Sequence, residues 1–150
     1  MTLPRDNDVI RGLGFVALYA AYLEEQIDNL LFMLAPFEPF TEEEQKWPTS
    51  RKIKKAKALI SELSFDYRDA LLGDLGTCKE LLDQRNEVIH GRIYAEFDRP
   101  DTLKSGRANV PDRVIEPEEL YDLAENLGEA RTAVLRPMIF QIPQLIQGCK

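Results

Sequence analysis

The segment LLDQRNEVIHGR, residues 81–92, brings together an arginine, an amide and the only histidine of the chain. These residues are Arg85, Asn86 and His90. A histidine titrates near neutral pH and can take up or release a proton, whereas an arginine keeps its charge and binds phosphate or carboxylate groups. The segment therefore combines a group that can move a proton with a group that can hold an anion.

Helical spacing places Arg85 on the apolar face of its helix. On a wheel at about 100° per residue, one stripe contains Leu71, Leu75, Cys78, Leu82 and Ile89. Arg85 falls within this stripe, and Asn86 lies on its flank with His90 one turn later. Glu87 is expected to point to the solvent side. Because burying an unpaired guanidinium costs several kcal/mol, Arg85 needs a carboxylate, a backbone carbonyl, water or a ligand phosphate.

A purely structural interpretation of these residues stays open. Arg85 can reach water near the end of the helix, or pair with an acid on another helix. His90 stands immediately before Gly91, and a positive charge in the last turn of a helix is favourable. The spacing alone does not choose between this interpretation and a functional one.

Four helices are expected to position the segment. The first begins near Asn7 or Asp8, either of which can cap it, and ends at about residue 35. The others cover residues 50–63, residues 67–90 and a final stretch from Pro117 that Pro137 and Pro143 kink or end. Gly73 and Gly76 lower helix propensity by about 1 kcal/mol each, so a break in the third helix is conceivable.

The region between the third and fourth helices has a different pattern. Residues 93–98 and 113–115 have β-propensity, and residues 99–112 are rich in turn formers. We therefore predict an all-α, antiparallel four-helix bundle forming one domain over residues 1–150, with a small hairpin or irregular insertion before the last long helix.

Composition narrows the class of protein. The chain has 150 residues and a net charge of −7, which argues against a general nucleic-acid coat but not against a local basic cleft. Its two cysteines form no disulfide framework, which favours a reducing cytoplasm. The apolar run at residues 13–23 is shorter than the roughly 20 residues of a spanning helix, so no membrane association is expected.

Two basic clusters are candidate phosphate contacts. Residues 50–57 read SRKIKKAK, which is either the solvated face of a helix or a track for a phosphate backbone. In this cluster Lys54 and Lys55 are the candidates, and in the hairpin region Arg92 and Arg107 are the candidates. Glu87 and His90 match half of a paired di-iron motif, but only one copy exists, so we expect neither a metal nor a cofactor.

The heptapeptide RNEVIHG, residues 85–91, resembles the motif of the HEPN superfamily, the higher eukaryotic and prokaryotic nucleotide-binding fold. In that motif a histidine follows an arginine after four to six residues, late in a long helix of an all-α bundle. The resemblance implies a metal-independent endoribonuclease that acts as a toxin or phage-defence effector. His90 would be its acid/base group, Arg85 would hold the scissile phosphate, and Asn86 would orient the imidazole or bind substrate.

The resemblance also implies a homodimer with a composite site at the interface. RNA cleavage by the 2′-hydroxyl needs one group to accept a proton and another to donate one. One histidine per chain supplies one such group, and a two-fold axis brings in its copy. The product would carry a 2′,3′-cyclic end.

Partners and alternatives follow from the same resemblance. Some of these toxins pair with a nucleotidyltransferase antitoxin and carry a tyrosine two residues after the histidine. Here that position is Arg92, and the nearest tyrosine is Tyr94. The resemblance implies an antitoxin or nucleotidyltransferase as a partner besides RNA, whereas Arg92 at this position argues against regulation by tyrosine adenylylation and against that specific partner. The alternative function is a non-catalytic helical module that binds a nucleotide, RNA or a partner protein.

Overall fold

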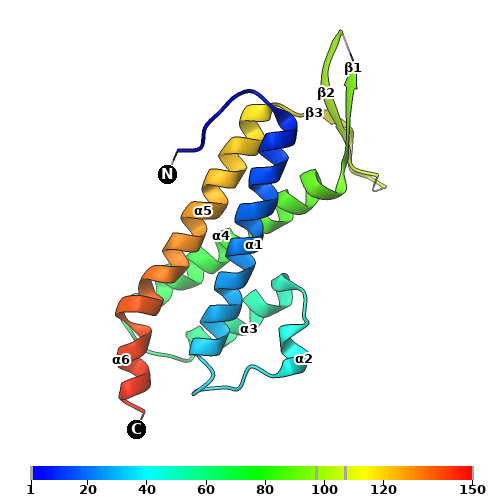
Figure 1. The fold of residues 1–150 in the computed structure, drawn as a ribbon. Helices are drawn as coiled ribbons and strands as arrows, with labels where there is room; N and C mark the ends of the chain where they lie inside the picture. The colour runs from blue at the N-terminus through cyan, green and yellow to red at the C-terminus, as the bar shows by residue number, and fades with distance from the viewer. Residues whose placement is uncertain (1, 97, 107, 150) are drawn as a thin grey trace. The chain divides into compact units, whose positions relative to one another are not determined.

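The computed structural model describes residues 2–96, 98–106 and 108–149, and Arg107 lies outside them. The chain is mostly helical with one small sheet (Figure 1). The helices are α1 (Val9–Met33), α2 (Glu42–Gln45), α3 (Thr49–Ser61), α4 (Arg68–His90), α5 (Pro117–Phe140) and α6 (Ile142–Gln147). The strands are β1 (Arg92–Glu96), β2 (Arg99–Lys104) and β3 (Arg113–Val114).

Residues group into two compact units. The first unit contains Met1–Ala21 and Glu80–Gly128, and the second contains Tyr22–Lys79 and Glu129–Lys150. Helices α1, α4 and α5 each contribute residues to both units. The segment with Arg85 and His90, together with the sheet, belongs to the first unit.

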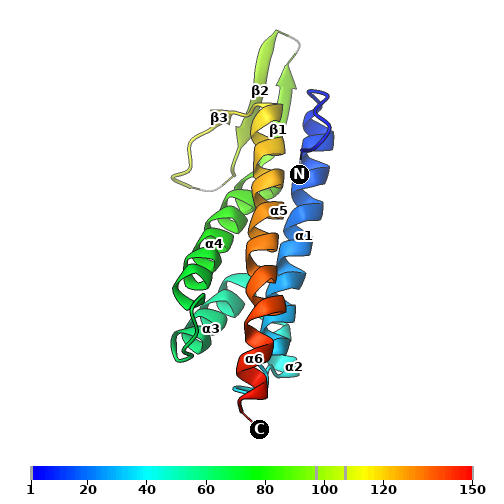
Figure 2. The same ribbon diagram turned by 90° about the vertical axis from the view of Figure 1, so that its left-hand side faces the viewer.

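In the first unit, the start of α1 packs against the start of α5 (Figure 2). The Asp8 carboxylate caps α1, because it accepts hydrogen bonds from the backbone N–H groups of Ile10 at 2.8 Å and Arg11 at 3.3 Å. The prediction that Asn7 or Asp8 caps this helix is thus confirmed for Asp8. The Tyr121 ring lies 5.9 Å from that of Phe15 between ring centroids, which joins the two helices through aromatic packing.

The sheet follows directly from the end of α4. Its strands are antiparallel in the order β1-β2-β3, with Ile93 paired to Leu103 and Thr102 paired to Val114. The small hairpin expected before the last long helix is present, but its second strand, β2, lies in the segment 99–112 that is rich in turn formers. Leu103 is 1% exposed, and its burial together with pairing on both sides outweighs the turn propensity of the neighbouring residues.

Helix α4 is continuous through Gly73 and Gly76, so the conceivable break there is absent. Leu71, Leu75 and Cys78 are fully buried. Burial of a leucine side chain contributes about 1.5–3 kcal/mol, more than the roughly 1 kcal/mol that each glycine costs. The other long helix with a predicted break, α5, contains Pro137 and ends at Phe140, and Pro143 lies in the first turn of α6.

The second unit also contains the short helix α2, which lies between the first two expected helices. Thr41 caps α2 and forms a capping box with Glu44, a pattern already present in the sequence TEEE. In α3, the apolar residues Ile53, Ala56 and Ile60 are buried. Among the described residues, no helix is long and apolar enough to cross a bilayer.

Candidate functional site

The last three turns of α4 place Arg85 on a buried face. Leu81, Leu82 and Val88 are buried, and they precede or follow Arg85 by three or four residues, so they surround it on the helix surface. Arg85 itself is half-buried, and its Nε atom is shielded from solvent. The side chain also interacts with other residues of the chain. The cation therefore lies among apolar side chains, where the helical spacing placed it.

Asn86 and His90 lie beside Arg85 on one flank of α4. Asn86 is half-buried, and His90 is exposed as the last residue of the helix. Because the two residues are four apart, their side chains are neighbours. The imidazole is thus accessible to a ligand, one turn beyond a cation that is only half accessible.

Gly91 allows β2 to close against the end of α4. A Cβ atom at this position would lie 2.4 Å from Leu103 Cδ1 and 2.9 Å from the backbone oxygen of Glu87. Both separations are shorter than van der Waals contact. The glycine therefore lets the buried Leu103 pack directly beside the turn that ends in His90.

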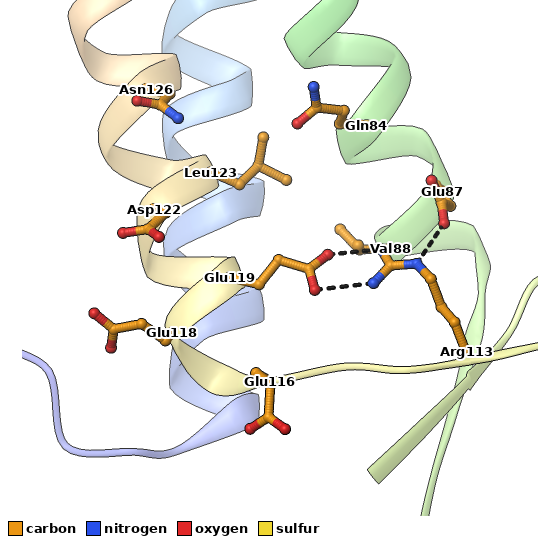
Figure 3. Close-up of a pocket in the computed structure, with 10 residues that line it drawn as sticks. All are labelled: Gln84, Glu87, Val88, Arg113, Glu116, Glu118, Glu119, Asp122, Leu123 and Asn126. Carbon is orange, nitrogen blue, oxygen red and sulfur yellow. Dashed lines mark hydrogen bonds and ion pairs between the residues drawn. The ribbon is translucent and has the colours of Figure 1, made fainter. Parts of the chain in front are cut away.

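The opposite flank of α4 borders a cavity of about 480 Å³. Its lining residues include Gln84, Glu87, Val88, Arg113 and Glu119 (Figure 3). The carboxylates of Glu87 and Glu119 both point toward the Arg113 guanidinium (Figure 3). Arg113 donates to Glu87 at 2.9 Å and to Glu119 at 2.6 and 2.9 Å.

This geometry corrects the expectation that Glu87 faces solvent. Glu87 is half-buried and links the last turns of α4 to β3 through Arg113, whose second partner Glu119 belongs to α5. The hydrogen bonds that Arg113 donates to Glu119 and then to Glu87 raise the pKa of Arg113 well above its usual range. Arg113 therefore connects the strand that follows the hairpin to both helices of the cavity.

The cavity is an unfavourable place for a phosphate. Besides Glu87 and Glu119, its lining contains Glu116, Glu118 and Asp122. Arg5 neutralises some of this charge, because it pairs with Glu118 and lies 2.9 Å from Asp122. The excess of carboxylates still repels anions. The chemistry expected of Arg85 and His90 therefore belongs to the other flank of the helix.

The basic candidates divide between the units. Arg92 is exposed at the start of β1, two residues after His90 in the first unit. Lys54 is exposed on α3 in the second unit. Arg107 lies outside the described residues. The structure brings Arg92 into the neighbourhood of the Arg85–His90 segment, whereas it does not relate Lys54 to that segment.

Lys55 is bound by its own chain. Its ammonium lies 2.6 Å from Glu44 and 3.2 Å from Glu38, donates to the backbone oxygen of Pro39 at 2.9 Å, and its side chain is only 8% exposed. Burial alone would lower the pKa of Lys55, but the hydrogen bonds with Glu44 and Glu38 outweigh burial and raise it. The ammonium group is already paired within the chain, so we exclude Lys55 as a contact for RNA phosphates.

A neighbouring lysine shows the same pattern. Lys52 is buried and pairs with Asp28 at 2.7 Å. The interpretation of residues 50–57 as a uniformly solvated face is therefore wrong for Lys52 and Lys55. It holds for Lys54 and Lys57, which are exposed.

Within the described part of the chain, no group of three or more His, Cys, Asp or Glu side chains is arranged to hold a metal ion.

The sequence did not reveal the link formed by Arg113, because its partner Glu87 is 26 residues away in the chain. It also did not reveal that Lys104 pairs in register with Arg92 and that the Lys104 ammonium lies 5.0 Å from the Tyr94 ring centroid. The alternation of residues in RIYAE was the available signal for Tyr94.

No family model, curated protein or solved structure matches this chain. The resemblance to the HEPN superfamily therefore depends on residues 85–91 and on their place in the fold.

Proposed function

We propose that this protein is a metal-independent endoribonuclease of the HEPN type that works as a homodimer. The observation that supports this best is the arrangement at the end of α4. A half-buried arginine lies on an apolar face, and an exposed histidine follows one turn later with Asn86 between them. A cation held in this way is fixed in place, while the imidazole remains free to meet a substrate.

The proposed reaction is an internal displacement at phosphorus. One imidazole accepts the proton of the RNA 2′-hydroxyl, and the 2′-oxygen forms a bond to phosphorus. The bond from phosphorus to the 5′-oxygen breaks, and that oxygen takes a proton from a second imidazole. Arg85 stabilises the negative charge that develops on the phosphoryl oxygens, and Asn86 orients His90. The products are a 2′,3′-cyclic phosphate and a 5′-hydroxyl.

The second imidazole would come from a second copy of the chain, related by a two-fold axis. An exposed apolar face supports self-association. In the first unit, α1 exposes Ile10, Gly14, Ala17, Leu18 and Ala21, which recur at helical spacing. Ile10 is 81% exposed and Leu18 is 44% exposed, and such apolar surfaces commonly mark protein interfaces.

The proposal extends to the setting of the enzyme. The helices α1, α3, α4 and α5 would form the four-helix bundle of that superfamily. A toxin or phage-defence role in a prokaryotic cytoplasm, restrained by an antitoxin, fits an enzyme that cuts RNA without a cofactor.

The test is cleavage of a labelled single-stranded RNA in the presence of EDTA. We expect wild type to release fragments with 2′,3′-cyclic ends, and His90→Ala and Arg85→Ala each to reduce the rate at least 100-fold. A substrate with a 2′-deoxy sugar at the cut site should resist cleavage, because it lacks the attacking group.

Gln84→Ala is the matched control, since Gln84 is exposed one residue before Arg85 and lines the cavity on the other flank. It should cut at the wild-type rate. Cleavage that persists in His90→Ala, or that requires a divalent cation, would refute the proposal.

A non-catalytic binding module is the second candidate. It is favoured by the half-buried position of Arg85 and by its interactions within the chain, which leave the guanidinium less available to a scissile phosphate. In that case wild type cuts no RNA, and His90→Ala changes only binding or stability. If Arg85 is instead only a structural ion-pair member, Arg85→Ala lowers the melting temperature and does nothing else.

A further inference from the structure

One face of the sheet is exposed and carries cations together with an aromatic ring. We call it the hairpin face, and it consists of Arg92, Tyr94, Thr102, Lys104 and Val114. Side chains alternate along a strand. Ile93 and Ala95 line a cavity of about 720 Å³ together with Ile115, and Leu103 is buried, so these residues define the inner face. Arg92, Tyr94 and their cross-strand partners then define the outer one.

Two cations lie directly opposite each other on the hairpin face. Arg92 of β1 pairs in register with Lys104 of β2, and both are exposed. Paired residues have Cα atoms about 4.5–5.5 Å apart, and like charges at that position destabilise the pairing. None of the side chains that define the face is acidic, and no described carboxylate forms an ion pair with Arg92 or Lys104. An anion bound between the two would relieve the repulsion.

An exposed aromatic ring adjoins this pair. Tyr94 is 45% exposed, and the Lys104 ammonium lies 5.0 Å from its ring centroid, within reach of a cation–π interaction. Tyr94 pairs with Thr102, which pairs with Val114 on the next strand, and Val114 is 48% exposed. The ring and the valine thus form an apolar platform beside two cations.

We propose that the hairpin face binds single-stranded RNA. Arg92 and Lys104 hold one backbone phosphate between them, and a neighbouring base stacks on Tyr94. Cations that follow the backbone next to an aromatic platform are how proteins hold single strands without reading sequence. A duplex offers Tyr94 no free base. Arg92 follows His90 by only two residues, so an RNA strand bound here extends to the proposed catalytic histidine. This inference therefore rests on the proposed function.

The experiment measures binding of oligouridine of about 12 nucleotides to the full chain carrying His90→Ala, by fluorescence anisotropy over a range of salt concentrations. Arg92→Gln and Lys104→Gln should each weaken binding, and each should lower the slope of log affinity against log salt by about 0.7. Tyr94→Leu should weaken binding about fivefold or more, with an unchanged slope. Tyr94→Phe should bind as well as the parent, because the ring remains.

The matched controls remove the same charge elsewhere. Lys46 and Arg136 are exposed and belong to the second unit, so Lys46→Gln and Arg136→Gln should change affinity by less than twofold. Thermal melts followed by circular dichroism exclude variants that do not fold. The proposal is wrong if Arg92→Gln and Lys104→Gln lose no more affinity than these controls. It is also wrong if duplex RNA binds equally tightly and Tyr94→Leu has no effect.

Parallel cleavage assays separate this inference from the proposed function. If wild type cuts no RNA while the hairpin variants still bind oligouridine more weakly, the enzyme proposal is wrong and the proposed binding face is supported. If wild type cuts RNA through His90 while the hairpin variants keep normal affinity for oligouridine and a normal KM, the proposed binding face is wrong and the enzyme proposal is supported.

Discussion

At the scale of single residues, Asp6 and Tyr121 connect the segment before α1 to α5. The Tyr121 hydroxyl donates a hydrogen bond to the Asp6 carboxylate at 2.5 Å, and Arg11 forms an ion pair with the same carboxylate. The tyrosine is fully buried. The hydrogen bond from Tyr121, followed by that from Arg11, lowers the pKa of Asp6, and the same bond raises the pKa of Tyr121.

This pair predicts a loss of stability in acid. A carboxylate whose pKa is lower in the folded state stabilises the fold above its unfolded pKa, and that contribution disappears as the pH falls through the folded value. We expect Tyr121→Phe to be less stable than wild type above about pH 5, with the difference shrinking below about pH 4. Urea denaturation at a series of pH values measures it.

Tyr67→Phe is the control, because it removes a hydroxyl from a half-buried tyrosine in the second unit. It should lose the same stability at every pH. If the difference in free energy of unfolding between Tyr121→Phe and wild type stays constant from pH 7 to pH 3, the loss of stability does not depend on the ionisation of Asp6.

The sequence predicted some residue environments and missed others for a physical reason. Arg85 could be placed because the helical period fixes its neighbours on its own helix. The partners of Glu87 and Lys55 could not, since Arg113 is 26 residues from Glu87 and Glu44 is 11 residues from Lys55. Contacts at such separations depend on how elements meet, which periodicity does not encode.

At the scale of elements, Gly73 inside α4 and Gly91 just after its end affect the stability of the fold in opposite directions. A Cβ atom at Gly91 would collide with Leu103 and with the backbone of α4, whereas one at Gly73 would meet nothing within 4 Å. Gly73 is exposed inside the helix. Alanine there would only reduce the freedom of the unfolded chain and raise helix propensity.

Alanine substitutions at these positions should therefore change stability with opposite signs. We expect Gly91→Ala to lower the free energy of unfolding by about 1–3 kcal/mol, and Gly73→Ala to raise it by about 0.5–1 kcal/mol. Urea denaturation of both variants checks this directly. If Gly91→Ala matches wild type, the end of α4 and Leu103 do not pack as closely as the structure shows.

The elements themselves were predictable to different degrees. The long helices α1, α3, α4 and α5 have a clear apolar period, and Asp8 and Pro117 mark two of their starts. Strand β2 could not be predicted, because Leu103 is the only strongly apolar residue in RPDTLK. Its strand conformation depends on pairing with β1 and β3, which only the folded chain supplies.

At the scale of the whole molecule, the proposed mechanism requires two histidines from two chains. The chain contains one histidine, and the exposed apolar face of α1 in the first unit offers a surface for a second copy. If each active site needs His90 from both protomers, a dimer with one His90→Ala subunit is inactive. A dimer whose protomers act independently would keep half of its activity.

Mixing experiments distinguish these cases. Wild type and His90→Ala are unfolded together, refolded at equal amounts and assayed at constant total protein. Random pairing leaves about one quarter of the dimers fully wild type, so activity should fall to about one quarter of the wild-type value if both histidines are needed, and to about one half if they are not. Mixing the two proteins after separate refolding is the control and should give one half until subunits exchange. One half under both conditions, together with a monomer mass by sedimentation, would end the case for a shared site, because no second imidazole would then be available to protonate the leaving oxygen.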